Sequence, residues 1–124
     1  MNETMGETLQ GLNVVVVEDE YFLADDVSRA LARGGARVLG PVATVERARE
    51  IIADRVDAAV LDVDLRGEVV FPIADLLVER GAAVVFLTGY EKHDIPDRFR
   101  DRPHLRKPAR GDEVVNALAT ALQR

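Results

Sequence analysis

Two patterns of hydrophobic and polar positions alternate along the 124-residue chain. Short apolar runs occur five times, and the longest of them, Leu12–Val17 and Ala82–Leu87, do not alternate regularly with polar residues. Such runs are typical of strands that are covered on both faces, as in parallel sheets. We therefore predict five strands, the last with the weakest pattern: Leu12–Val17, Arg37–Leu39, Ala58–Leu61, Ala82–Leu87 and Pro103–Arg106.

Apolar residues between these runs recur with the period of a helix. In the first intervening segment, Leu23, Val27 and Leu31 lie four residues apart on one face. Similar stripes follow the second and fifth runs, and a shorter one follows Pro72, a residue that is accepted in the first turn of a helix. Residues 91–102 have no apolar stripe, so we expect the fourth helix to be short or irregular.

Alternating strands and helices predict an α/β fold with right-handed crossovers and a doubly wound parallel sheet. For five strands the common order is 2-1-3-4-5, and the ligand crevice lies at the carboxyl ends of the strands, beside strands 1 and 3. The sequence has no evident linker, repeat or low-complexity tract. We expect a polar N-terminal tail, residues 1–11, and one domain, residues 12–124.

The composition is that of an ordinary globular protein, with 48% hydrophobic and 31% charged residues. The absence of cysteine excludes disulfides and thiolate metal sites. The longest unbroken apolar run, Ala82–Leu87, is too short to span a membrane. The polar start of the chain does not resemble a secretory signal. We therefore expect a cytoplasmic protein with no membrane partner.

The net charge of −6 argues against general nucleic-acid binding, which needs clustered basic residues. The charge is unevenly distributed, however. The segment Lys92–Arg110 contains seven Lys or Arg and three Asp, so it is +4 and the rest of the chain is −10. This segment is either a solvated surface or a docking site for an acidic protein partner.

Polar residues stand at the ends of four predicted strands. Glu18 and Asp19 follow the first strand, Asp62 the third, Thr88 the fourth and Lys107 the fifth. In the expected order these four strands are neighbours, with a spacing of roughly 4.8 Å. Singly, such residues are most often helix caps or turn residues. Together they predict one pocket at the carboxyl edge of the sheet.

The chemistry of this pocket favours a divalent cation. Two carboxylates about 5 Å apart repel by roughly 3 kcal/mol at an effective dielectric constant near 20. Mg²⁺ suits such a site because it binds a few carboxylate oxygens and keeps its remaining waters, and it can polarise a phosphoryl oxygen. The carboxylate of Asp62 can then act as a nucleophile towards phosphorus. The Lys107 ammonium and the Thr88 hydroxyl are suited to phosphoryl oxygens.

Four motifs resemble the receiver domains of two-component response regulators over residues from about 12 to 123. They are Val-Val-Glu-Asp-Glu, Leu-Asp-Val-Asp-Leu, Phe-Leu-Thr-Gly-Tyr and Arg-Lys-Pro, in this order along the chain. The resemblance implies a flavodoxin-like fold in which Asp62 is the phosphoacceptor. It also implies that Asp19 and Asp62 bind Mg²⁺ directly, that Glu18 binds through a metal-bound water, and that Asp64 offers its backbone carbonyl.

The resemblance further implies that Lys107 contacts the phosphoryl group and that its bond to Pro108 is cis. The phosphoryl donor would be a phosphohistidine on a sensor histidine kinase or a phosphotransfer protein. The stretch 86–90 is similar to the one that gives the FAT GUY subgroup of single-domain receivers its name, with Leu87 in place of Ala. Receivers usually carry an aromatic switch residue where this chain has His104. Tyr90 is a candidate substitute, or alternatively an aromatic that packs on the edge of the sheet.

Three functions are compatible with the sequence. The first is a stand-alone receiver that is not an enzyme and signals by binding a downstream protein near residues 90–110, or serves as a phosphate sink. The second is a phosphatase, because Asp62-Val63-Asp64 resembles the Asp-x-Asp of haloacid-dehalogenase-type enzymes. The other acidic pair precedes this motif, however, and only sixty residues follow it. The third is a receiver-like binding module that does not depend on phosphorylation, which the missing switch aromatic would permit.

Overall fold

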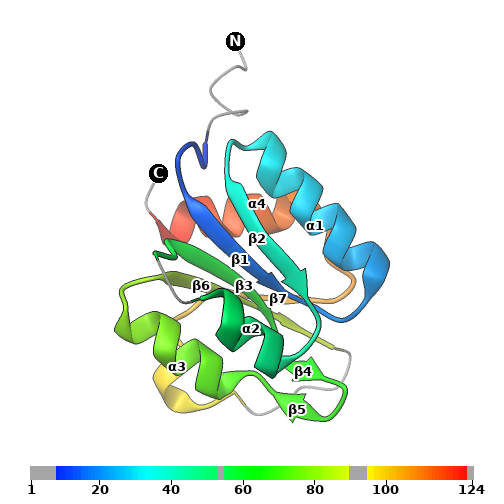
Figure 1. Ribbon diagram of the computed structural model, residues 1–124, viewed down its shortest axis with the longest axis vertical. Coiled ribbons are helices and arrows are strands. Elements are labelled where there is room, and N and C mark those ends of the chain that lie inside the picture. Colours follow the sequence, from blue (N-terminus) through cyan, green and yellow to red (C-terminus); the bar gives the residue numbers. More distant parts are fainter. Residues whose placement is uncertain (1–7, 53–54, 90–94, 123–124) are drawn as a thin grey trace.

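The computed structural model describes residues 8–52, 55–89 and 95–122, which form a five-stranded parallel sheet with helices on both faces (Figure 1). The strand order is β2-β1-β3-β6-β7. It corresponds to the predicted order 2-1-3-4-5 of a flavodoxin-like fold. The strands lie where the apolar runs predict them: β1 (Asn13–Val17), β2 (Arg37–Val42), β3 (Ala58–Asp62), β6 (Ala83–Thr88) and β7 (His104–Arg106).

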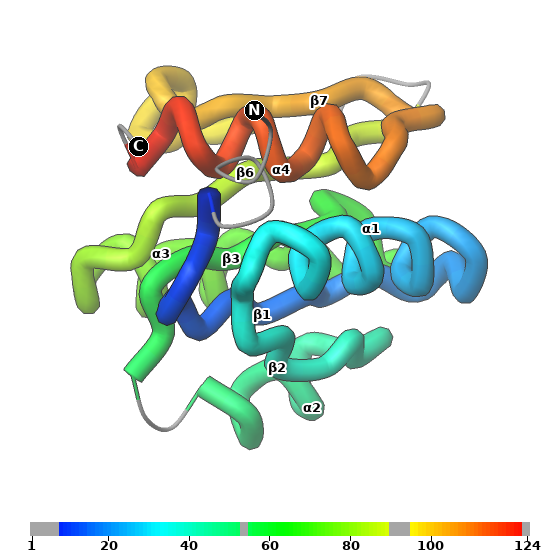
Figure 2. Tube along the Cα trace, turned by 90° about the horizontal axis from the view of Figure 1, so that it is seen from above, coloured from blue at the N-terminus to red at the C-terminus, as the bar shows by residue number. Residues whose placement is uncertain are grey.

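Two pairs of helices cover the sheet. Helices α1 (Tyr21–Arg33) and α4 (Gly111–Ala121) lie side by side over one face, and α2 (Val45–Ile51) and α3 (Phe71–Glu79) cover the other (Figures 1 and 2). Their positions confirm the helical stripes of the sequence. No helix in the described part of the chain is both long and apolar enough to cross a membrane.

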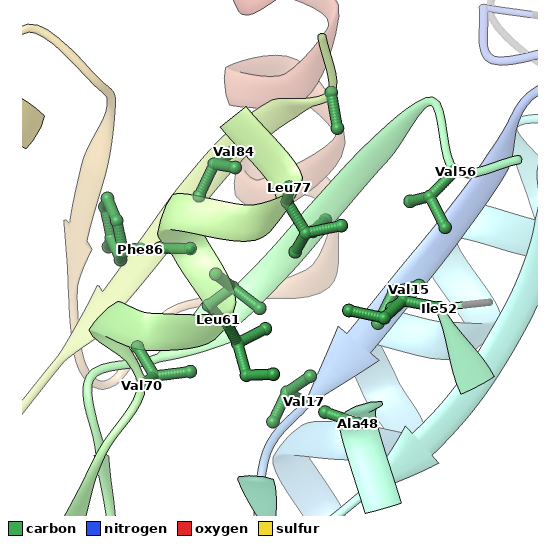
Figure 3. Packing of buried hydrophobic residues seen from close by; sticks show 14 of the residues in the cluster. Val15, Val17, Ala48, Ile52, Val56, Leu61, Val70, Leu77, Val84 and Phe86 are labelled. Carbon is green, nitrogen blue, oxygen red and sulfur yellow. The ribbon is translucent and has the colours of Figure 1, made fainter. Parts of the chain in front are cut away.

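The core explains why the strand sequences do not alternate. In β1, Val14 and Val16 belong to the apolar cluster beneath α1 and α4, whereas Val15 and Val17 belong to the cluster beneath α2 and α3. Figure 3 shows Val17 beside Ala48 of α2 and Val15 beside Ile52, the residue that follows this helix. Both faces of the strand are therefore buried, and every position favours an apolar residue.

Among the described residues between β6 and β7 there is one short 3-10 turn, η2 (Asp97–Phe99), in keeping with the missing apolar stripe. The ring of Phe99 is almost fully buried and lies 5.8 Å from that of Phe71 and 5.3 Å from that of Phe86. One aromatic side chain thus anchors this turn to the sheet and to α3. Residues 90–94 of the segment lie outside the described residues.

A small hairpin after β3 was not predicted. Strands β4 (Asp64–Leu65) and β5 (Glu68–Val69) pair antiparallel through the turn residues Arg66 and Gly67, whose φ angles are 54° and 92°. Positive φ at both turn positions is the geometry of the tight hairpin turn, for which Asn-Gly and Asp-Gly are the recognisable sequences. Arg-Gly gives a weaker signal. The Asp64 carboxylate stabilises the turn by accepting a hydrogen bond from the Gly67 amide (2.9 Å).

Packing extends to Leu9, ahead of residue 12, where we expect the domain to begin. The Leu9 side chain is fully buried, and its amide donates a hydrogen bond to the carbonyl of Gly34 (2.7 Å). The segment 8–11 is therefore attached to the end of α1.

Gly111 brings the first turn of α4 close to α1. Its amide donates a hydrogen bond to the Asp26 carboxylate at 2.7 Å. A β-carbon at position 111 would lie 2.7 Å from the β-carbon of Ala30 and 2.7 Å from the backbone carbonyl oxygen of Asp26. Since neither neighbour is a flexible side-chain end, only glycine allows this approach.

Replacing Gly111 with alanine should therefore destabilise the protein by about 1–3 kcal/mol, because the overlap outweighs the better helix propensity of alanine. Urea denaturation measures the change. The control is Asn116→Ala on the exposed face of the same helix, which should alter the free energy of unfolding by no more than about 0.5 kcal/mol. Equal stabilities for the two variants would contradict the close approach.

Candidate functional site

The predicted site residues meet at the carboxyl edge of the sheet. Glu18 and Asp19 follow β1, Asp62 ends β3, and Lys107 follows β7. The parallel register aligns these ends, since Val17 pairs with Leu61, Asp62 with Leu87, and Thr88 with Arg106. The topology therefore gathers side chains that lie up to 89 positions apart in the sequence.

Three carboxylates form the floor of the site. Oxygen atoms of Glu18, Asp19 and Asp62 all lie within 4.8 Å of one another. The side chain of Glu18 is fully buried, that of Asp62 is 3% exposed and that of Asp19 is 13% exposed. Loss of hydration raises the pKa of Glu18 to about 7, and the same cause raises the pKa of Asp62. Negative charge is costly here unless a cation compensates it.

Lys107 provides one such cation. Its Nζ donates hydrogen bonds to Asp62 Oδ2 (3.0 Å), Glu18 Oε2 (3.2 Å) and Glu20 Oε2 (3.0 Å). Burial by itself would lower the pKa of Lys107, but the hydrogen bonds to Glu20 and Asp62 and the nearby negative charge raise it overall. The ammonium group therefore stays charged, and it uses all three of its protons on carboxylates.

The acidic cluster also fits a divalent cation. Glu18 Oε1 is buried and accepts no hydrogen bond, although the Lys107 ammonium lies 3.1 Å away in an ion pair. A buried carboxylate oxygen without a donor is unfavourable. A hard cation, or a water bound to it, would satisfy this oxygen, and carboxylates are the ligands that such cations prefer.

A pocket of about 340 Å³ opens onto Asp62. Leu23 and the Pro108–Ala109 segment contribute an apolar part of its wall. The complete lining consists of Glu20, Leu23, Asp62, Asp64, Gly89, Lys107, Pro108 and Ala109. The Asp62 carboxylate is thus buried from bulk solvent yet accessible to a small group that enters this pocket.

Asp64 and Thr88 support the site through their backbones. The Asp64 amide donates a hydrogen bond to Asp62 Oδ1 (3.1 Å), which orients that carboxylate. Thr88 is half-buried at the end of β6, and its carbonyl accepts a hydrogen bond from the Lys107 amide (2.7 Å). The roles expected for the Asp64 carbonyl and the Thr88 hydroxyl stay predictions.

The structure describes two of the three predicted switch residues, Pro108 and His104. The bond between Lys107 and Pro108 is cis, as the resemblance implies. His104 is exposed on β7, with its ring 6.3 Å from that of Phe86. Tyr90 lies outside the described residues.

The sequence did not identify two further residues of the site. Glu20 binds Lys107, and Arg66 at the tip of the hairpin places its Nε 3.4 Å from Asp19 Oδ2. Glu20 directly follows the acidic pair, so its position could have indicated a role. Arg66 gave no signal, because it reaches Asp19 only through a hairpin that was not predicted.

Comparison with known proteins gives the family. The chain is similar to SdrG from Sphingomonas melonis Fr1 in its solution structure, with 38% identity, a TM-score of 0.78 and coverage of 93% of this chain and 98% of that one. It is also similar to the BeF3-activated conformation of SdrG from Pseudomonas melonis Fr1, with 38% identity, a TM-score of 0.70 and coverage of 90% and 96%.

A third match is the signal receiver domain of a modulated diguanylate cyclase from Desulfovibrio desulfuricans G20. It shows 26% identity, a TM-score of 0.72 and coverage of 90% of this chain and 94% of that one. No protein-family model and no curated protein matches the chain. On its fold, its acidic pocket and these relatives, the chain belongs to the response regulator receiver family. Members of this class are signalling phosphoacceptors and not conventional enzymes.

Replacing Lys107 with methionine should destabilise the protein by about 3 kcal/mol in the presence of EDTA, because it leaves Glu18 and Asp62 without their buried cation. Urea denaturation measures the change. A divalent cation should restore part of the loss, since it supplies positive charge to the same carboxylates.

Arg29→Met is the control for this experiment, because Arg29 forms an exposed pair with Asp25. It should cost at most about 0.5 kcal/mol. If Lys107→Met were as stable as Arg29→Met, the ammonium would not compensate the buried acids.

Proposed function

We propose that this protein accepts a phosphoryl group on Asp62, with Mg²⁺ as cofactor, from a phosphohistidine on a sensor histidine kinase or a phosphotransfer protein. The observation that supports this most directly is the position of Asp62. Its carboxylate lies at the bottom of a pocket, between an acidic cluster that fits a divalent cation and the ammonium of Lys107.

In the proposed reaction, an oxygen of Asp62 forms a bond to phosphorus while the bond between phosphorus and the donor's imidazole nitrogen breaks. The Asp64 amide orients the Asp62 carboxylate during this step. Lys107 and the Thr88 hydroxyl bind the phosphoryl oxygens, whose negative charge increases in the pocket. The product is an aspartyl phosphate.

Glu18, Asp19 and Asp62 are the side chains that would hold Mg²⁺, together with the backbone carbonyl of Asp64. The bound ion supplies positive charge to the phosphoryl oxygens. Arg66 competes with the ion for one of these carboxylates, because it forms an ion pair with Asp19. Glu18 has the further role of holding Lys107 next to Asp62.

The output that we propose is protein binding, or removal of phosphoryl groups from the kinase as a phosphate sink. We assign the chain to the stand-alone FAT GUY subgroup because of its stretch 86–90, and to the cytoplasm. The segment 90–110 is the proposed contact for a downstream partner, because its part from Lys92 to Arg110 has a net charge of +4, unlike the acidic remainder of the chain. We propose no nucleic-acid partner, given the total charge of −6.

Incubation with acetyl phosphate and Mg²⁺ should add one phosphoryl group to the protein, detectable by intact-mass spectrometry. Asp62→Asn should abolish the product, because the amide lacks the nucleophilic oxygen. Asp75→Asn is the matched control, since Asp75 lies on α3 and pairs with Arg98 (2.7 Å) away from the pocket.

Wild-type protein that stays unmodified with acetyl phosphate and with several donor kinases would refute the proposal. Steady hydrolysis of simple phosphate esters would instead indicate the phosphatase. Partner binding that is identical for wild type and Asp62→Ala would indicate a module that does not depend on phosphorylation.

Asp19→Asn should weaken Mg²⁺ binding by more than about tenfold, because even the partners of metal ligands commonly contribute this much to affinity. Titration calorimetry gives the dissociation constant. Asp75→Asn removes the same charge from α3 and should leave the affinity unchanged within error. Equal affinities for both variants would place the ion elsewhere.

A further inference from the structure

The side chain of Glu20 does not have the role that its position suggests. Glu20 is the N-cap of α1, where a short polar side chain usually accepts a hydrogen bond from the first turn of the helix. Glu20 makes no such bond. It lines the pocket above Asp62 instead and accepts a hydrogen bond from Lys107 (3.0 Å). Its conformation is therefore explained by the site and not by the helix.

The hydrogen bonds of Lys107 leave no proton for a ligand. An ammonium group has three N–H donors, and those of Lys107 go to Glu18, Glu20 and Asp62. A phosphoryl group on Asp62 can receive a hydrogen bond from Lys107 only if one carboxylate gives up its bond. The exposure of each carboxylate to water decides which of the three hydrogen bonds breaks at the lowest cost in free energy.

Glu20 is the carboxylate that can leave at the lowest cost. Glu18 is fully buried, and its Oε2 also accepts a hydrogen bond from the Glu20 amide (2.8 Å), so it cannot move into water. Asp62 receives the phosphoryl group itself. The Glu20 side chain is 62% exposed and can rotate into solvent, where water replaces the lost hydrogen bond.

We propose that Glu20 is a positioning residue that holds Lys107 while Asp62 is unmodified, and that the phosphoryl group displaces it. Glu20 thus competes with the phosphoryl group for Lys107, and its charge at the pocket repels the incoming anion. The competition weakens phosphoryl binding. This inference rests on the proposed phosphorylation of Asp62.

Beryllofluoride, added as a phosphoryl mimic in the presence of Mg²⁺, tests the competition. Glu20→Gln should bind it about three- to fivefold more tightly than wild type in titration calorimetry, as expected for the loss of one exposed ion pair. Glu20→Asp keeps the charge on a shorter side chain and should fall between the two. Glu79→Gln is the control, because it makes the same change of charge at an exposed position at the far end of α3.

The ammonium signal of Lys107 distinguishes displacement from a structural role. The chain contains two lysines, Lys92 and Lys107, so ¹⁵N-lysine labelling gives a simple NMR spectrum. Without ligand, Glu20→Gln should shift the Lys107 signal relative to wild type. With beryllofluoride bound, both proteins should give the same signal, because Glu20 has already left.

The outcomes separate the two proposals. Wild-type protein that neither binds beryllofluoride nor becomes phosphorylated would refute the proposed function. If wild type binds but Glu20→Gln binds no more tightly than Glu79→Gln, only the inference about Glu20 is wrong. It is also wrong if the Lys107 signals of wild type and Glu20→Gln still differ in the bound state.

Discussion

The site depends on the ion pairs between the Lys107 ammonium and the buried carboxylates of Glu18 and Asp62. Acids with so little access to water are unfavourable without positive charge nearby, and the raised pKa of Glu18 reflects this. One lysine balances the cluster in part, while Glu18 Oε1 keeps an unused acceptor. The site is therefore folded around a deficit of positive charge, which a divalent cation can fill.

The sheet makes this arrangement possible. Because its strands are parallel, all their carboxyl ends lie at one edge, and two apolar layers hold them in register. The rigid core therefore sets the distances between Asp62, Lys107 and the acids of β1. The parts that can adjust lie above this edge: the exposed side chain of Glu20, and Arg66 on its hairpin. Buried carboxylates held in place by the sheet, with the exposed charges of Glu20 and Arg66 around them, suit a protein whose charge changes when it is modified.

Charged side chains of the protein itself occupy the groups that a divalent cation or a phosphoryl group would use. Lys107 pairs with Asp62 and Arg66 pairs with Asp19, so internal cations compensate these carboxylates in part. Glu20 in turn occupies the donor of Lys107 that a phosphoryl oxygen would use. In the function that we propose, each incoming group would replace an internal partner, so the affinity of the site would be the difference between two similar interactions.

The sequence by itself determined the sheet order, the two covered faces and the convergence of Glu18, Asp19, Asp62 and Lys107. These features follow from local patterns, since unbroken apolar runs require burial on both faces and strand ends in a parallel sheet share one edge. Only the tertiary structure decided the Arg66 hairpin, the close approach at Gly111 and the partner of Glu20. A hairpin with an Arg-Gly turn has a weak local signal, and both contacts join residues more than eighty positions apart. These two contacts depend on how α1 packs against α4 and on where the chain leaves β7, which no local pattern encodes.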